Sequence, residues 1–165
     1  MEIFSNFMDP GGGGEMLGRY VHFLAGITWI GMLYYFNFVQ TPAFAEVSDA
    51  TRSEAMRTIT WRALWWFRFG ALLTFLSGIW ILGAQKLLGE RFDDFWTTPS
   101  GLSIAIGALF AITMFLNVWG VIWRNQKIVL ANAANVLNGG APDPAAAGAG
   151  RKAVMASRQN AILSV

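Results

Sequence analysis

Three long apolar segments dominate this sequence, and their length constrains the fold more than any other feature. They cover residues 20–39, 63–84 and 102–123. A helix of about 20 residues, rising about 1.5 Å per residue, crosses a hydrocarbon core of about 30 Å. The segments are apolar on all sides, whereas a helix on the surface of a soluble protein keeps one polar face. The sequence therefore predicts an all-α integral membrane bundle with three spanning helices.

The composition favours the same class of protein. Hydrophobic residues make up 55% of the 165 residues and charged residues 13%, which is about half the charged share of a soluble domain. The net charge of +2 is too small to indicate a nucleic-acid-binding protein. Because the chain has no cysteine, disulfides, thiolate metal sites and a cysteine nucleophile are excluded.

The basic residues predict the orientation of the bundle. Three cations, Arg19, Lys86 and Arg91, fall on the side of the N-terminus. The opposite side holds eight, namely Arg52, Arg57, Arg62, Arg124, Lys127, Arg151, Lys152 and Arg158. Because cytoplasmic loops carry the excess of Lys and Arg, we expect the N-terminus outside. An aromatic belt at the inner boundary agrees with this orientation, and its members are Trp61, Trp65, Trp66, Trp119 and Trp123.

The segments outside the spans predict three domain parts. Residues 1–19 form an N-terminal tail, and residues 20–123 form the transmembrane domain. Pro42 is expected to end the first span, because proline lacks a backbone donor. Residues 124–165 form an inner-side helical extension of the third helix, followed by a Gly/Pro linker over 139–150 and a C-terminal helix too short to span.

Small residues recur every four positions in the second and third spans, and such stripes let helices approach closely in a membrane. The two stripes predicted to pack against other helices are Gly70, Thr74 and Gly78, and Ser103, Gly107 and Ala111. Three amides inside the spans, Asn37, Gln40 and Asn117, are interpreted as donors or acceptors between helices rather than as ligands.

Two side chains are candidates for chemistry. His22, the only histidine, shares a helix face with Gly26 and Trp29. A histidine beside a small residue is typical of an axial haem ligand, whereas the alternative is an interfacial histidine bonded to a headgroup, water or a helix. Arg68 is an intramembrane cation, which is a functional candidate by default, although its long side chain can also extend to the inner boundary. The predicted topology places His22 and Arg68 at opposite faces, so they form no catalytic pair.

Several runs resemble one known family over nearly the whole chain. They are HFLAGITWIGMLYYFNFVQTP from His22, ALWWFRFGA from Ala63, WRNQKIV from Trp123, GAPDP from Gly140 and ASRQNAILSV from Ala156. Together they resemble the front part of the membrane domain of bacterial urate hydroxylases, the urate oxidase N-terminal family, without its later helices or its cytochrome c domain. The resemblance implies a multi-pass protein of the bacterial inner membrane, with His22, Trp29, Gly31 and Arg68 at motif positions.

Two functions follow as expectations. The first is a small membrane subunit of this type, packed in lipid as a homo-oligomer or within a larger electron-transfer complex. The alternative is a redox protein that binds haem b through His22 and acts with cytochrome c or quinone, in purine oxidation. The sequence has no paired carboxylates in its spans, no phosphate-binding loop and no metal-spaced cluster. We therefore expect no catalysis by this chain alone, and we rank a transporter or channel last.

Overall fold

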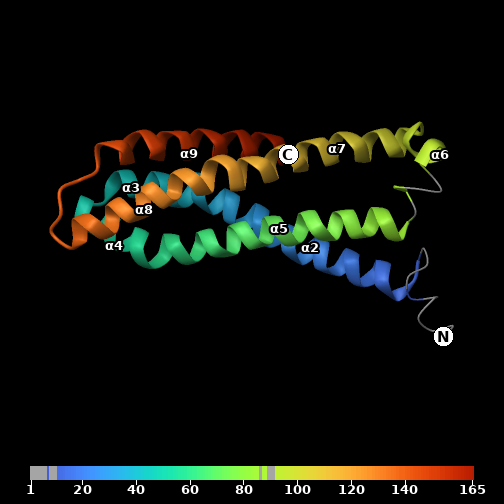
Figure 1. Cartoon of the computed structure of the whole chain (residues 1–165), viewed down its shortest axis with the longest axis horizontal. Helices are drawn as coiled ribbons and strands as arrows, with labels where there is room; N and C mark the ends of the chain where they lie inside the picture. The colour runs from blue at the N-terminus through green and yellow to red at the C-terminus, as the bar shows by residue number, and fades with distance from the viewer. Residues whose placement is uncertain (1–6, 8–10, 86, 89–91) are drawn as a thin grey trace.

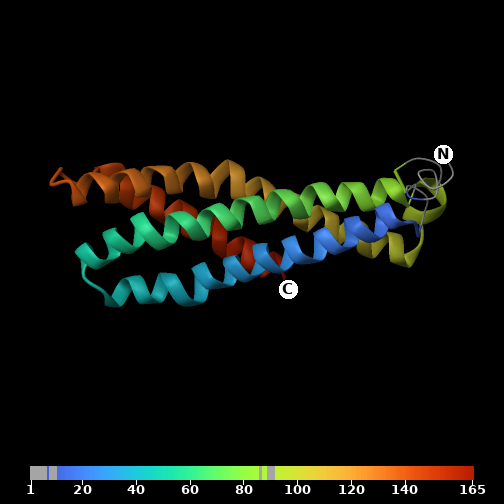
Figure 2. The same ribbon diagram turned by 90° about the horizontal axis from the view of Figure 1, so that it is seen from below.

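The computed structural model describes residues 7, 11–85, 87–88 and 92–165, and these form helices with no strand among them. Four long helical rods lie side by side along the long axis of the molecule (Figures 1 and 2). They cover residues 13–46, 49–84, 99–137 and 144–163. The all-α prediction is confirmed for the described residues, whereas the number of spans and their orientation stay predictions.

The first three rods each consist of α-helical parts joined by a π-helical turn. The first contains α2 (Gly13–Tyr34), η1 (Tyr35–Gln40) and α3 (Thr41–Glu46). The second contains α4 (Asp49–Ala55), η2 (Met56–Thr60) and α5 (Trp61–Ala84). The short α6 (Phe92–Trp96) precedes the third rod, which contains α7 (Pro99–Leu116), η3 (Asn117–Ile122) and α8 (Trp123–Leu137). The fourth rod is α9 (Pro144–Leu163).

Two helices have the length and composition needed to cross a membrane, Asp49–Ala84 and Pro99–Leu137. The rod over residues 13–46 is not one of them, because polar side chains such as His22 and Asn37 lower its hydropathy. In the most apolar stretch of Pro99–Leu137, only 11% of the residues are buried inside the protein. This rod therefore presents nearly all of its apolar surface outward.

The first rod continues through Pro42, which the sequence predicted to be its end. The reason is the π-helical turn η1 directly before it, where the Thr41 amide donates to the carbonyl of Phe36 five residues earlier. The Thr41 hydroxyl donates to the same carbonyl at 2.7 Å. In a π-helical turn the backbone amides donate to carbonyls five residues earlier instead of four. The helix can therefore continue through a proline, which has no amide proton to donate.

Two other boundaries also differ from those predicted. The first helix begins at Gly13 rather than near residue 20, so residues 13–19 belong to it and not to a tail. The linker expected over 139–150 ends at Asp143, whose carboxylate accepts from the Ala145 amide at 2.8 Å and so caps α9. The third rod ends at a glycine, as predicted, because Gly139 follows α8 with a φ of 82°.

The core lies where α2, α5, the end of α7 with η3, and α9 meet. Leu33, Phe67 and Val118 are fully buried there. The closest approach is between α2 and α5 at Gly70, where an added Cβ would lie 3.2 Å from the Trp29 backbone nitrogen and 3.3 Å from the Ala25 carbonyl. The α2–α5 pair is therefore in backbone contact, which only a residue without a side chain permits.

The second small-residue stripe does not pack against a helix of this chain. Ser103 and Gly107 are exposed, and a Cβ added at Gly107 would meet nothing within 4 Å. The packing of Ser103, Gly107 and Ala111 against a helix of another subunit stays a prediction. Figure 1 shows that α9 runs along α8 and reaches only the C-terminal end of α7.

Amide side chains join the π-helical turns to neighbouring helices, as predicted for Asn37, Gln40 and Asn117. Asn37 Nδ2 donates to Ser157 Oγ at 2.8 Å, and Gln40 Oε1 accepts from Thr60 Oγ1 at 3.0 Å. Asn117 Nδ2 donates to Asn160 Oδ1 at 2.9 Å. Asn160 in turn donates to the Met114 carbonyl at 3.0 Å. The bonds of Asn37 and Asn117 fix η1 and η3 against α9, and the bond of Gln40 joins η1 to η2.

Replacing Asn160 by leucine is expected to lower the free energy of unfolding by about 1–3 kcal/mol, because the Met114 carbonyl and the Asn117 amide each lose a buried partner. Thermal unfolding in detergent micelles measures the change. The control is Gln159→Leu, since Gln159 is exposed and lies 3.4 Å from the Asn117 amide. Equal effects of the two substitutions would contradict a structural role for the buried amide.

A buried carboxylate ties the start of α2 to the end of α5. Glu15 accepts from the Gly11 amide at 2.7 Å, from Gln85 Nε2 at 2.8 Å and from Arg19 Nε at 2.7 Å. These donors, the Gly11 amide first, hold the pKa of Glu15 at about 2 instead of 4.5. Because all three bonds favour the ionised form, Glu15 contributes stability only while it is charged.

The stability contributed by Glu15 is expected to be complete above pH 4.5 and to disappear as the pH falls toward 2, since a lowered folded-state pKa favours the folded state at higher pH. Glu15→Gln is expected to lose about 1–2 kcal/mol at neutral pH and to flatten this acid dependence. Unfolding measured across that pH range checks both effects. The exposed Glu46→Gln serves as the control, and an acid profile unchanged by Glu15→Gln would contradict the assignment.

Candidate functional site

His22 projects from α2 against α5, where its Nδ1 atom has two oxygen partners. Nδ1 lies 2.9 Å from the Thr74 carbonyl oxygen and 3.1 Å from Ser77 Oγ. A carbonyl only accepts, so Nδ1 carries the proton. The Ser77 hydroxyl donates its own proton to the Leu73 carbonyl at 2.6 Å, so Ser77 Oγ also accepts from His22. The contacts therefore select one tautomer of the ring.

In this tautomer Nε2 is unprotonated and has a free lone pair. Across the described ranges of the chain, Nε2 forms no hydrogen bond. A histidine whose Nδ1–H donates to a backbone carbonyl while Nε2 stays free has the arrangement found in metal-ligating histidines. The hydrogen bond fixes the ring orientation. His22 is thus prepared to act as a ligand.

A shallow, open groove of about 490 Å³ runs along α2 beside the ring. Apart from His22 its lining is apolar, and it consists of Phe23, Gly26, Ile27, Ile30 and Gly31. A Cβ at Gly31 would meet nothing within 4 Å, and one at Gly26 would touch only the Thr74 methyl group at 4.0 Å. The two glycines therefore form the hollow of the groove.

Trp29, predicted to border a cofactor beside His22, does not line this groove. It is 3% exposed and packs into the core between α2 and α5. Its position three residues after Gly26 turns it toward Gly70, where the missing side chain makes room for it. Gly26 and Gly31 do lie beside His22, so the structure brings together two of the predicted positions and separates the third.

The small-residue stripe of α5 forms the wall behind His22. Thr74 supplies the carbonyl that accepts from Nδ1, and a Cβ at Gly78 would lie 3.3 Å from His22 Cε1. The sequence predicted Gly70, Thr74 and Gly78 as helix-packing positions but did not predict Thr74 and Ser77 as partners of His22. The sequence signal for these partners is a single histidine on one helix together with a neighbouring helix that has a face of small and hydroxyl-bearing residues.

Arg68 belongs to a separate site on the other side of α5. It is 7% exposed, and its guanidinium Cζ lies 3.4 Å from the centre of the Trp123 ring. The other aromatic side chains around it are Trp61, Phe69 and Trp119, at 5.7–5.9 Å. The side chain is thus enclosed by aromatic rings, in contrast to the exposed position expected for a chain that extends freely to the membrane boundary.

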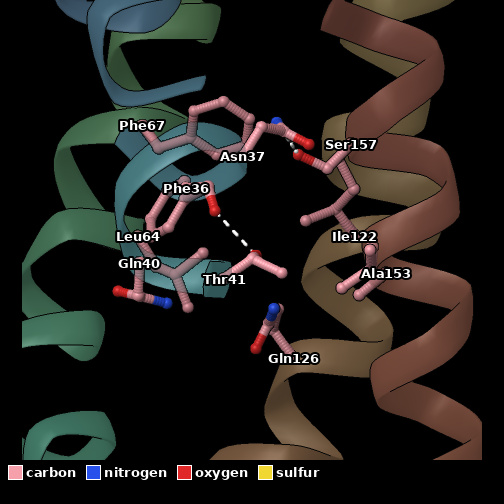
Figure 3. A pocket seen from close by; sticks show the side chains of 11 residues that line it. Phe36, Asn37, Gln40, Thr41, Leu64, Phe67, Ile122, Gln126, Ala153 and Ser157 are labelled. Atoms are coloured by element: carbon pink, nitrogen blue, oxygen red, sulfur yellow. Dashed lines mark hydrogen bonds between the residues drawn. The ribbon is translucent and has the colours of Figure 1, made fainter. Parts of the chain in front are cut away.

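A small polar cavity of about 40 Å³ lies between η1, α5, α8 and α9 (Figure 3). Its polar lining consists of Asn37, Gln40, Thr41, Gln126 and Ser157. Gln126 Oε1 is buried and has no hydrogen-bond partner among the described residues. The cavity has room for one to a few water molecules, which would satisfy this oxygen. Sequence reasoning missed it, because its members come from four separate rods.

Among the residues whose placement is described, no group of three or more His, Asp or Glu side chains could hold a metal ion. Comparison with models of known families, with curated proteins and with solved structures found no match. The proposals for function therefore rest on the residues around His22 and around Arg68.

Proposed function

We propose that the protein is a multi-pass subunit of the bacterial inner membrane, of the urate hydroxylase membrane-domain type, which works within a larger electron-transfer assembly. The observation that carries this proposal is the rod Pro99–Leu137, whose most apolar stretch has only 11% of its residues buried inside the protein. In water such a surface would aggregate, whereas in lipid it needs no cover. The resemblance over the runs from His22 to Val165 supports the type of subunit.

The proposal includes three spans with the N-terminus outside. Two of the rods have the length and composition of spans. The rod over residues 13–46 is proposed as the third because His22 and Asn37, the least apolar residues of the predicted span 20–39, are bonded to the carbonyl of Thr74 and to Ser157. Buried partners of this kind lower the cost of polar groups in a membrane.

Single cysteines test the topology, since the chain has none of its own. We expect Ala50→Cys to react with a membrane-impermeant maleimide only in inverted vesicles, and Met16→Cys and Ser100→Cys only in intact cells. These three positions are exposed. Labelling of Met16→Cys and Ala50→Cys from the same side would exclude the first span. Release of the protein by alkaline carbonate would overturn the membrane proposal itself.

A second function, haem b binding, is favoured by the tautomer of His22. Thr74 and Ser77 hold the proton on Nδ1 and orient the ring, so Nε2 would hold the haem iron, and Gly26 and Gly31 would leave space for a flat macrocycle. When bound, the haem supplies one-electron transfer, with cytochrome c or quinone as the partner. The visible spectrum of the purified protein, with His22 present and replaced, is the test.

The exposed face of α7 supports assembly with further helices, as a homo-oligomer or with other subunits. Leu102, Leu109 and Leu116 recur along it at 58–61% exposure. Blue-native electrophoresis after mild solubilisation tests this part of the proposal. A band of monomer size in every detergent would contradict it.

A further inference from the structure

The cation at Arg68 has no acidic counterpart in the described part of the structure, where the ion pairs join Arg19 to Glu15, Arg52 to Asp49 and Arg57 to Glu54. A buried charge without a partner is costly. Arg68 is nevertheless buried, with only 7% of its surface exposed. The aromatic rings around it supply cation–π attraction but accept no hydrogen bonds in the plane of the guanidinium.

The hydrogen-bonding groups of Arg68 are mostly unused. Nε donates to the Leu64 carbonyl at 3.2 Å. Within the described residues, neither Nη atom has a hydrogen-bond partner, and neither is among the fully buried unpaired atoms. Both Nη atoms therefore keep an opening to the outside of the bundle. Four N–H groups in a planar fork are available there, which is the geometry that binds two oxygens of a phosphate.

The surroundings of this opening point to a lipid headgroup. Trp61, Trp65 and Trp66, each 44–56% exposed, lie at the start of α5 in the row of tryptophans expected at a membrane boundary. A second cation, Lys127, has its Nζ atom 5.9 Å from the centre of the same Trp123 ring that Arg68 covers. Arg68 and Lys127 thus lie against the same indole ring, and no described carboxylate is bonded to either cation. This arrangement favours the binding of an anion at the boundary between protein and lipid.

We propose that Arg68, with Lys127, binds the phosphate of an anionic phospholipid headgroup at the inner boundary of the membrane. The Trp123 ring holds the guanidinium in place, and the Nη atoms donate to the phosphate oxygens. A carboxylate of a partner protein would have the same charge, but the exposed tryptophans place lipid at this level. The inference rests on the proposed membrane location, and it assigns Arg68 a role separate from His22.

The test is thermal unfolding of the purified full chain in phosphatidylcholine vesicles with and without phosphatidylglycerol, combined with native mass spectrometry of retained lipid. We expect phosphatidylglycerol to raise the melting temperature of the wild type and to remain bound. Arg68→Gln should weaken this binding about tenfold or more, since charge-assisted hydrogen bonds are lost. Arg68→Lys should restore part of it, because the charge returns without the planar fork.

The matched control is Arg151→Gln, which removes one exposed cation from α9 on the same side and should keep the phosphatidylglycerol effect. If Arg68→Gln does not fold, the wild type and Lys127→Gln carry the test, with a smaller loss expected for Lys127→Gln. No preference of the wild type for phosphatidylglycerol, or protection by inorganic phosphate alone, would overturn the proposal. Failure of the protein to associate with any vesicle would instead overturn the membrane location.

Discussion

The His22→Ala protein is expected to lack the Soret band that the wild-type protein shows after purification from cells supplied with haem. Nε2 of His22 is the one histidine nitrogen that the chain can offer to iron, because Nδ1 is bonded to the Thr74 carbonyl. Removing the ring takes away the axial ligand, so we expect loss of the whole band and not a shift. The visible spectrum, normalised to protein concentration, measures the effect.

Two further variants separate ligation from general damage. Gly26→Leu keeps His22 but fills the groove, so we expect a strongly reduced Soret band at an unchanged melting temperature. Ser77→Ala removes one acceptor while the Thr74 carbonyl remains, so the band should persist. A wild type without a Soret band, or a band of equal strength in His22→Ala, would rule out haem ligation by His22 and leave the membrane-subunit proposal intact.

The second large effect is expected at Gly70, where α2 and α5 are in backbone contact. Gly70→Leu should lower the free energy of unfolding by about 3 kcal/mol or more, because even a Cβ would lie 3.2 Å from the Trp29 nitrogen and overpacking against rigid backbone has no relief. Thermal unfolding in detergent and the yield of folded protein measure the loss. Because Trp29 and His22 share α2, haem binding should fall as well.

Gly107→Leu is the matched control for Gly70→Leu, since Gly107 is also a glycine in a small-residue stripe of an apolar helix. It has open space around it, so we expect the stability of the isolated chain to change little. Blue-native electrophoresis of the same variant should show a smaller species if the α7 stripe packs against another subunit. A large destabilisation by Gly107→Leu would mean that the α7 stripe is covered within the chain after all.

The apolar pattern predicted the rods well, because helices that expose apolar surface on all sides leave a strong signal in sequence. It predicted less about their ends. The first rod tolerates Pro42 only because η1 precedes it, and no residue type predicts a π-helical turn. The interhelical roles of Asn37 and Asn117 were predictable from polarity alone, whereas their partners Ser157 and Asn160 required knowledge of where α9 lies.

The candidate sites could likewise be predicted only in part from the sequence. His22 was identifiable as the only histidine, but its tautomer depends on the Thr74 carbonyl, which every residue possesses and no sequence pattern marks. The sequence predicts Trp29 beside the cofactor, because a helical wheel gives the direction of a side chain. It does not give the neighbouring helix that the side chain contacts. The aromatic enclosure of Arg68 joins residues 55 positions apart, from Arg68 to Trp123, and only the packing of α5 on the third rod brings them together.

The π-helical turns divide each of the first three rods into two stretches that can vary independently. A π-helical turn holds one residue more than an α-helical turn, and each residue advances the side chains by about 100° around the axis. One extra residue in η1 and in η3 therefore resets which faces of α3 and α8 point inward, without altering α2 or α7. Single-residue insertions and deletions at these turns offer evolution a way to remodel the half of the bundle beside α9 while His22 keeps its contact with α5.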